Sequence, residues 1–273
     1  MSAHDESKHQ VITSPANPRV KWLVSLRKRR VRDAEGLMIA EGYDELRLAV
    51  DAGVRPHSLF HCPLLAGDAG RLRLATELRA QGTAVVELSR AAFAKASVRE
   101  SPDGWLAVVP TPGQTLDTLR LSDRPLLLVC DAVEKPGNLG AMLRTAEAAG
   151  VDAVIAAAPV ADWGNPNVVR ASKGTIFAVP VAAASSADVA DWLRLHGVAI
   201  VAASPQTDTL VTDLDLTRGT AIVVGAEHAG LDKFWLEEAD AIATLPMVGQ
   251  VNSLNVAAAA AAIVYEAVRQ RNV

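Results

Sequence analysis

The sequence has few cysteines and no long apolar segment, and each shortage excludes a class of protein. Its only cysteines are Cys62 and Cys130, which excludes a disulfide framework and a cysteine-based zinc site. We expect both to be buried thiols, and we expect no metal site. Apolar runs reach about ten residues before Gly, Pro or charge interrupts them, too short to span a bilayer. The polar opening, residues 1–10, lacks the pattern of a signal peptide, so we expect a cytoplasmic protein without membrane contact.

The chain has enough apolar residues for a sizeable core: 50% of 273 residues are hydrophobic, and the length allows one large or two ordinary domains. The pattern predicts a disordered tail at 1–12, an α/β domain at 13–110, a linker at 111–121 that contains Pro112 and Gly113, and a second α/β domain at 122–273. In the first domain we expect a helix opening at Asn17 and Pro18, then strand 37–40, helix 43–52, strand 58–61, helix 71–80, strand 84–88, helix 90–96 and strand 105–109.

The second domain alternates apolar strands with helices, which is typical of a mainly parallel sheet covered on both faces. We expect strands at 125–131, 153–157, 176–181, 198–203, 221–225 and 241–245, and helices at 139–149, 166–173, 187–195, 232–236 and from Ser253 to Arg269. Ser253 is a good N-cap residue for the last, alanine-rich helix. Ligands of such sheets bind at the carboxyl ends of the strands, which places the site there.

One stretch of the first domain is strongly basic. Seven basic residues and no acidic residue lie between positions 19 and 32, so that the remainder of a chain with a total charge of −4 carries −11. Such a one-sided cluster indicates a contact with phosphates, although a solvated helix face has the same composition. The candidate RNA-binding residues are Arg19, Lys21, Arg27, Lys28, Arg29, Arg30 and Arg32.

Three loops after predicted strands carry polar residues that the fold alone does not require. They are Pro136-Gly-Asn138-Leu-Gly-Ala-Met-Leu-Arg144-Thr, Val223-Val-Gly225-Ala-Glu227-His228-Ala-Gly230-Leu and Leu245-Pro-Met-Val-Gly-Gln-Val-Asn-Ser253-Leu-Asn255-Val. Glycines permit close approach of backbone to a ligand, and an arginine suits phosphate or a developing oxyanion. None of the loops has the form of a P-loop, a dinucleotide fingerprint or a nucleophile elbow. His228 fits an exposed loop residue better than a catalyst.

The order and spacing of these three loops resemble the SpoU (TrmH-type) family of SPOUT-class RNA 2′-O-ribose methyltransferases. With Arg170-Ala-Ser-Lys-Gly174-Thr-Ile-Phe-Ala-Val-Pro180, the resemblance covers about residues 122–271. The first domain is similar to the family's ribosomal-protein-like substrate-binding domain. Two departures are Leu245, where Ile is more usual, and Ala257, where Ser is common.

The resemblance implies a trefoil-knotted SPOUT domain, a homodimer formed through it, and S-adenosylmethionine as cofactor. It implies cofactor contacts from Ala203, Gly225, Leu245, Met247 and Leu254, and a catalytic site of Asn138, Arg144, Glu227, Ser253 and Asn255. Because a guanidinium holds its proton tightly, we expect Arg144 to hold phosphate and stabilise the emerging alkoxide rather than act as the base.

The expected function is therefore methylation of a ribose 2′-hydroxyl in RNA, with ribosomal RNA favoured by the separate N-terminal domain. The alternatives are a transfer RNA 2′-O-methyltransferase and a non-catalytic RNA-binding protein of the same fold. An unknotted nucleotide-binding enzyme, such as a dehydrogenase or kinase, would need a glycine fingerprint that the sequence lacks.

Overall fold

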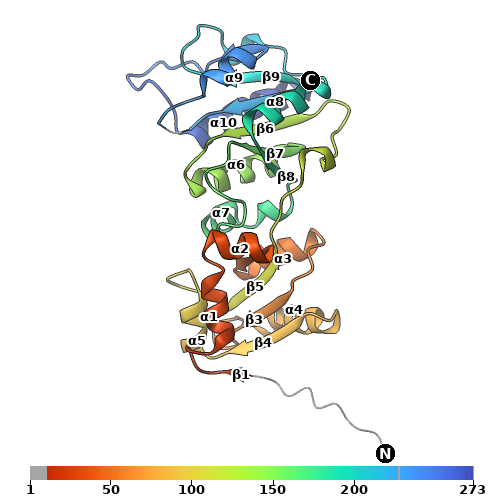
Figure 1. Cartoon of the computed structure of the whole chain (residues 1–273), viewed down its shortest axis with the longest axis vertical. Helices are drawn as coiled ribbons and strands as arrows, with labels where there is room; N and C mark the ends of the chain where they lie inside the picture. The colour runs from red at the N-terminus through yellow and green to blue at the C-terminus, as the bar shows by residue number, and fades with distance from the viewer. Residues whose placement is uncertain (1–10, 227, 273) are drawn as a thin grey trace, which may run out of the picture. The chain divides into compact units, whose positions relative to one another are not determined.

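The computed structural model describes residues 11–226 and 228–272, and the chain divides into two compact units, Met1–Thr111 and Pro112–Val273 (Figure 1). Each unit has its own sheet and its own core. No helix within the described ranges combines the length and the apolar character that crossing a membrane requires.

The N-terminal unit is built on a mixed five-stranded sheet with strand order β1-β4-β3-β5-β2. Strands β1 and β3 run parallel to β4, while β5 runs antiparallel to β3 and β2. The strands are β1 (Val11–Ile12), β2 (Leu37–Glu41), β3 (Ser58–His61), β4 (Ala84–Leu88) and β5 (Trp105–Pro110). The helices are α1 (Pro18–Ser25), α2 (Arg29–Glu35), α3 (Tyr43–Asp51), α4 (Ala69–Ala80) and α5 (Arg90–Ala96).

Two details at the start of this unit differ from the expectation. Strand β1 lies inside the predicted disordered tail, because Val11 and Ile12 pair with Glu87 and Leu88 at the edge of the sheet. The expected first helix is two helices. The Asn17 side chain accepts a hydrogen bond from the Arg19 N–H and Pro18 occupies the first helical position, so α1 begins as predicted. It ends at Ser25, which divides the basic stretch between two helices and their connection.

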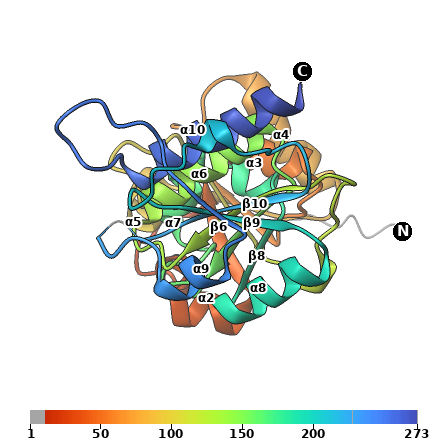
Figure 2. The ribbon, with the colours of Figure 1, turned by 90° about the horizontal axis from the view of Figure 1, so that it is seen from above.

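The C-terminal unit is built on a six-stranded sheet in which every pair is parallel, with order β11-β9-β10-β6-β7-β8. The strands are β6 (Leu126–Asp131), β7 (Ala153–Ala157), β8 (Val181–Ala184), β9 (Ala199–Ala203), β10 (Thr220–Val224) and β11 (Ala241–Ala243). The helices are α6 (Pro136–Ala149), α7 (Pro166–Ser172), α8 (Ser186–Leu195), α9 (Lys233–Glu238) and α10 (Val256–Arg271). Helices α6 and α10 cover one face of the sheet, and α8 and α9 cover the other (Figure 2).

The strand order places a ligand site at one edge of this sheet. From β6 the chain adds β7 and β8 on one side, and it then returns to build β10, β9 and β11 on the other side. In open parallel sheets, ligands bind outside the carboxyl ends of the strands where the order reverses. The loops that follow β6 and β10 flank this reversal, and the loops that follow β9 and β11 lie beside them at the same edge of the sheet.

Several predicted elements of this unit have other bounds in the structure; helix α6, for example, begins at Pro136, three residues before its predicted start. The expected strand 176–181 is a 3₁₀ helix, Thr175–Phe177, followed by β8, because Lys173 and Gly174 both adopt left-handed backbone and turn the chain after α7. Strand β11 ends at Ala243, which leaves Leu245 in the following loop. Helix α10 begins after Asn255, not after Ser253.

Candidate active site

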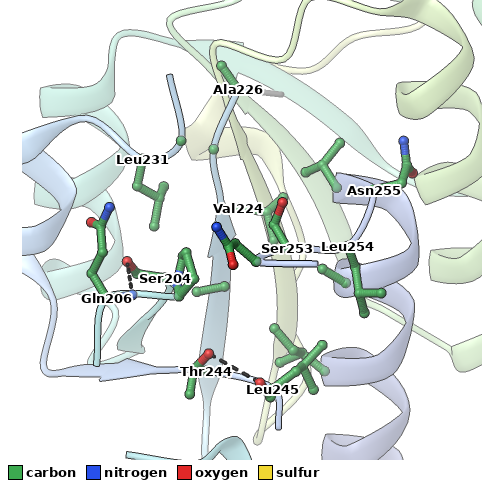
Figure 3. A pocket seen from close by; sticks show the side chains of 18 of the residues that line it. Ser204, Gln206, Val224, Ala226, Leu231, Thr244, Leu245, Ser253, Leu254 and Asn255 are labelled. Atoms are coloured by element: carbon green, nitrogen blue, oxygen red, sulfur yellow. Dashed lines mark hydrogen bonds between the residues drawn. The ribbon is translucent and has the colours of Figure 1, made fainter. Parts of the chain in front are cut away.

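A cavity of about 530 Å³ lies at the carboxyl ends of β9, β10 and β11. Its size is typical of pockets for small ligands and cofactors. The residues that follow the three strands and those that precede α10 all contribute to its wall (Figure 3). They include Ala203, Ser204 and Gln206 after β9, Gly225 and Ala226 after β10, Leu245 and Met247 after β11, and Asn252, Ser253, Leu254 and Asn255 before α10. All five residues predicted to bind the cofactor line this cavity.

Gly225 lies where the chain folds back on itself at the end of β10. A Cβ atom at Gly225 would stand 2.3 Å from the carbonyl carbon of Gly230, closer than non-bonded atoms approach. The turn is closed by a hydrogen bond of 3.0 Å from the Gly230 N–H to the Ala226 carbonyl. A glycine is required here because no side chain fits between the strand end and the turn, and backbone therefore forms this part of the wall.

The rest of the wall combines apolar side chains with polar groups from the loops. Leu231, Leu245 and Leu254 provide apolar surface, and Leu254 is 45% exposed although it is a large hydrophobic residue. On the polar side, Ser204 is nearly buried and its hydroxyl accepts a hydrogen bond of 3.2 Å from the Gln206 N–H (Figure 3). An apolar slot with polar groups at its rim fits a purine nucleoside such as the adenosyl group of S-adenosylmethionine.

Asn255 connects the cavity to the first motif. Its Oδ1 accepts a hydrogen bond of 3.0 Å from the Ala257 N–H, which caps α10, and its Nδ2 donates one of 3.2 Å to Oδ1 of Asn138. The predicted capping role of Ser253 is wrong, since Asn255 holds that position. Ser253 instead lines the cavity. Asn138, Ser253 and Asn255, predicted from two separate motifs, are thus brought together.

Arg144 lies apart from this cavity in the single chain. It is exposed on α6 and lines a second hollow of about 500 Å³ between α6, the end of α7 and α10. Helix α7 can lie this close to α6 because residue 140 is a glycine; a Cβ atom there would lie 2.4 Å from Cβ of Ala171.

Of the predicted catalytic residues, Glu227 falls outside the described residues. Two residues without a predicted role, Lys135 and His228, line the first cavity. Lys135 directly precedes the first motif, and this position is the only sign of its role that the sequence offers.

The basic stretch contains two arginines with structural roles. Arg32 is 2% exposed and donates to the carbonyl oxygens of Leu26 and Arg27 at 3.0 and 2.7 Å. The guanidinium of Arg27 donates to three carbonyls at the end of α5, those of Lys95, Ala96 and Ser97. The prediction that Arg32 binds RNA is therefore wrong, because its side chain is buried. The guanidinium of Arg27 caps the end of α5 through these hydrogen bonds.

The other basic residues of the stretch remain at the surface. Lys21, Lys28 and Arg30 are exposed, as are Arg19 and Arg29, and Arg29 lies 3.5 Å from the carboxylate of Asp33. No group of three or more His, Cys, Asp or Glu side chains in the described part of the chain is arranged to hold a metal ion.

Comparison with known proteins matches each of the two units to a protein family. Residues 125–265 match the model of the SpoU rRNA Methylase family, and residues 17–107 match that of the MRM3-like substrate binding domain. A 23S rRNA (uridine(2479)-2′-O)-methyltransferase of Streptomyces viridochromogenes is 33% identical, over 92% of this chain and 89% of that protein.

Solved structures agree over nearly the whole chain. The crystal structure of an RNA 2′-O ribose methyltransferase is 39% identical with a TM-score of 0.83, covering 97% of this chain and 100% of that one. An AdoMet-bound rRNA methyltransferase from Sinorhizobium meliloti is 28% identical with a TM-score of 0.88, covering 95% and 97%. The predicted fold class, an α/β substrate-binding domain followed by a SPOUT domain with a mainly parallel sheet, is confirmed, and the chain belongs to the SpoU rRNA methylase family.

Proposed function

We propose that this chain is a cytoplasmic, homodimeric enzyme that transfers a methyl group from S-adenosylmethionine to a ribose 2′-hydroxyl of ribosomal RNA. The observation that carries the proposal is the convergence of three strand-end loops and the start of α10 on one cavity, with Asn255 bonded to Asn138 beside it. The names of its relatives support the choice of ribosomal RNA, because one acts on 23S rRNA and another was solved as an rRNA methyltransferase with AdoMet bound.

The cavity walls suit this cofactor. Leu245 and Leu254 would pack against the adenine ring, and the backbone at Gly225, where no side chain intervenes, would donate and accept hydrogen bonds. S-adenosylmethionine supplies an electrophilic methyl group attached to a sulfonium. The protein has to orient the ribose, hold the adjacent phosphate and stabilise the oxygen as its proton leaves.

Several polar side chains of the two motifs would perform these tasks. Asn138 and Asn255 hold each other in position by their hydrogen bond, which fixes the donors and acceptors that face the ribose. Ser253 adds a hydroxyl from the cavity wall. Arg144 would bind the phosphate and stabilise the alkoxide, with Glu227 as a further polar group of the site.

A homodimer would bring Arg144 to the cofactor. In the single chain Arg144 lines a different hollow from the cofactor-binding residues, so a site that uses both needs the partner subunit's Arg144. The outer faces of α6 and α10, which pack side by side, offer a surface for this contact: Tyr265 is 49% exposed, and the neighbouring Ala258 and Ala262 are exposed and small. Small side chains allow helices of two subunits to approach closely.

The N-terminal unit would contribute contacts to the phosphates of the RNA. Lys21, Lys28 and Arg30 provide exposed positive charge on α1, α2 and their connection, in a chain whose total charge is −4. Contacts of this type supply affinity through phosphates and do not read the base sequence.

A methylation assay with several RNAs tests the proposal. Purified protein and S-adenosylmethionine labelled in the methyl group would be incubated with 23S rRNA, 16S rRNA and transfer RNA, and the labelled nucleotide identified by nuclease digestion. We expect a 2′-O-methylated nucleoside in ribosomal RNA alone. Label found in transfer RNA alone would mean that transfer RNA, and not ribosomal RNA, is the substrate. Binding of NAD or ATP in place of S-adenosylmethionine would overturn the proposal.

A further inference from the structure

The second hollow has the composition of an anion site. It lies between α6, the end of α7 and α10 and has a volume of about 500 Å³. Arg144 and Lys173 contribute two cations, and Glu147 contributes one carboxylate. Arginine and lysine side chains are the groups that proteins use to bind the phosphates of nucleic acids.

Both cations are available to a ligand. Arg144 and Lys173 are exposed, and neither side chain forms a hydrogen bond or an ion pair with any described residue. Of the four hydroxyls in the hollow, three are already used as donors: Ser172 donates to the carbonyl of Val169 and Thr175 to that of Ser172, each at 2.9 Å, and Thr145 donates to that of Ala141 at 3.3 Å. The fourth belongs to Tyr265, on the face proposed above for subunit contact. The arginine and the lysine are therefore the donors that an anion would meet first.

The backbone of Lys173 is unusual for a lysine. It ends α7 with φ 51° and ψ 36°, the left-handed conformation that favours glycine, and Gly174 continues in the same region with φ 84°. An exposed side chain gains no packing that would offset this conformational cost. The close approach of α6 and α7 at Gly140 brings the end of α7, and with it Lys173, into the hollow that Arg144 lines.

We infer that Arg144 and Lys173 together bind a backbone phosphate of the substrate RNA next to the ribose that is methylated. This inference rests on the proposed function and adds a positioning residue to it. The 3′-phosphate of a ribonucleotide is attached through O3′ to C3′, and the neighbouring carbon, C2′, carries the 2′-hydroxyl, so a group that holds the phosphate also positions the reacting oxygen. Lys173 binds as a point charge and leaves part of the Arg144 fork for the 2′-oxygen.

Three substitutions at Lys173 separate charge from backbone strain. Lys173→Gly removes the cation and relaxes the left-handed residue, Lys173→Ala removes the cation alone, and Lys173→Arg keeps it. Lys233→Ala is a matched control, because Lys233 is an exposed lysine of the same unit, with its side chain 85% accessible, and lies outside both cavities. The probe is a 23S rRNA transcript, and the measurements are RNA affinity at several salt concentrations, S-adenosylmethionine affinity, kcat, KM and Tm.

We expect Lys173→Gly and Lys173→Ala to weaken RNA binding by about tenfold, the scale of one lost charge-assisted hydrogen bond. The slope of log affinity against log salt should fall by about 0.7 to 0.9, the value for one phosphate contact. KM for RNA rises more than kcat falls, S-adenosylmethionine affinity is unchanged, and Tm of the glycine variant is not below that of the wild type. Lys173→Arg and Lys233→Ala should match the wild type.

Unchanged RNA affinity and salt slope in both Lys173→Gly and Lys173→Ala would overturn the inference. The result is separate from the fate of the proposed function. If the wild type transfers no methyl group but Lys173 variants still bind RNA with a smaller salt slope, the phosphate site stands and the enzymatic assignment fails. If the wild type methylates RNA and the variants do so with unchanged KM, the phosphate site fails alone.

Discussion

Asn255 donates a hydrogen bond of 3.2 Å to Asn138 while its own Oδ1 caps α10, so one side chain both starts the last helix and links two motifs that lie 117 residues apart. The two tasks can be separated by mutation. Asn255→Ser keeps a good capping oxygen but is too short to reach Asn138, whereas Asn255→Ala removes both bonds. We expect the alanine variant to lose about 1 kcal/mol of stability, the usual value of a cap.

Both variants should lose turnover by about tenfold or more, since each removes the bond that positions Asn138. Thermal denaturation and kcat measured on the same preparations check this. Equal activity of Asn255→Ser and the wild type would mean that the Asn138 link has no part in catalysis.

Gly225 gives a prediction about cofactor binding. Gly225→Ala places a methyl group 2.3 Å from the Gly230 backbone, so the turn at the end of β10 has to move and the cavity wall with it. We expect S-adenosylmethionine affinity to fall by about tenfold or more, on the scale of lost hydrogen bonds to displaced backbone, in a titration followed by calorimetry. Gly249→Ala is the matched control, because nothing lies within 4 Å of a Cβ atom there. A normal affinity of Gly225→Ala would show that the turn does not bind the cofactor.

Part of the fold and of the site could be predicted from the sequence alone. Local rules predicted β3, β4, β7 and α5 with the observed bounds, because apolar runs, turn residues and the cap Ser89 lie next to one another in the chain. The motif residues were predicted through family resemblance, and the structure then brought Asn138 to Asn255. Neither source could separate Arg32 from Lys28 in the basic stretch, because burial of Arg32 depends on how α2 folds back on α1.

Those two residues give opposite predictions. Arg32→Ala should lower the stability of the N-terminal unit by about 1 to 3 kcal/mol, because it leaves the carbonyls of Leu26 and Arg27 without their buried donor. Combined Lys28→Ala and Arg30→Ala should leave Tm within a degree or so of the wild type and weaken RNA binding with a smaller salt slope. Chemical denaturation and RNA binding at several salt concentrations measure both. A salt slope unchanged in the double variant would assign Lys28 and Arg30 to solvation of the surface.

Arg144 leads to a prediction about active sites that are built from two subunits. Arg144→Ala should lose at least about 100-fold in kcat, the scale of one transition-state donor, with S-adenosylmethionine affinity nearly unchanged. If the partner's Arg144 completes each site, a heterodimer of Arg144→Ala with Gly225→Ala contains one site with both an intact cavity and an intact arginine. Co-expression with two different affinity tags provides this heterodimer. At an S-adenosylmethionine concentration near the wild-type Kd, we expect it to reach about half of the wild-type rate, while the Gly225→Ala homodimer stays at about a fifth of that rate or less and the Arg144→Ala homodimer at about a hundredth. A heterodimer as inactive as its parents would place Arg144 and the cavity of one site in the same chain.

The ionisation of Glu266, near the end of α10, should make the stability of the protein depend on pH. Its carboxylate accepts hydrogen bonds of 2.8 Å from Arg269 and from Gln270, and these bonds lower the pKa of Glu266 to about 2 from an ordinary value of 4.5. Gln270 in turn bonds to the backbone of Leu214 and Leu216, so the carboxylate helps to hold the helix end against the segment before β10.

Because the pKa of Glu266 is lower in the folded than in the unfolded chain, its contribution to stability is complete above pH 4.5 and is lost as the pH falls towards 2. The difference in Tm between the wild type and Glu266→Gln should therefore be constant from pH 7 to about 5 and should shrink below that. Calorimetric Tm values of both proteins between pH 2.5 and 7, in a buffer of constant ionic strength, measure this difference. A difference in Tm that keeps the same size down to pH 2.5 would show that the hydrogen bonds to Glu266 do not depend on its charge, contrary to the lowered pKa.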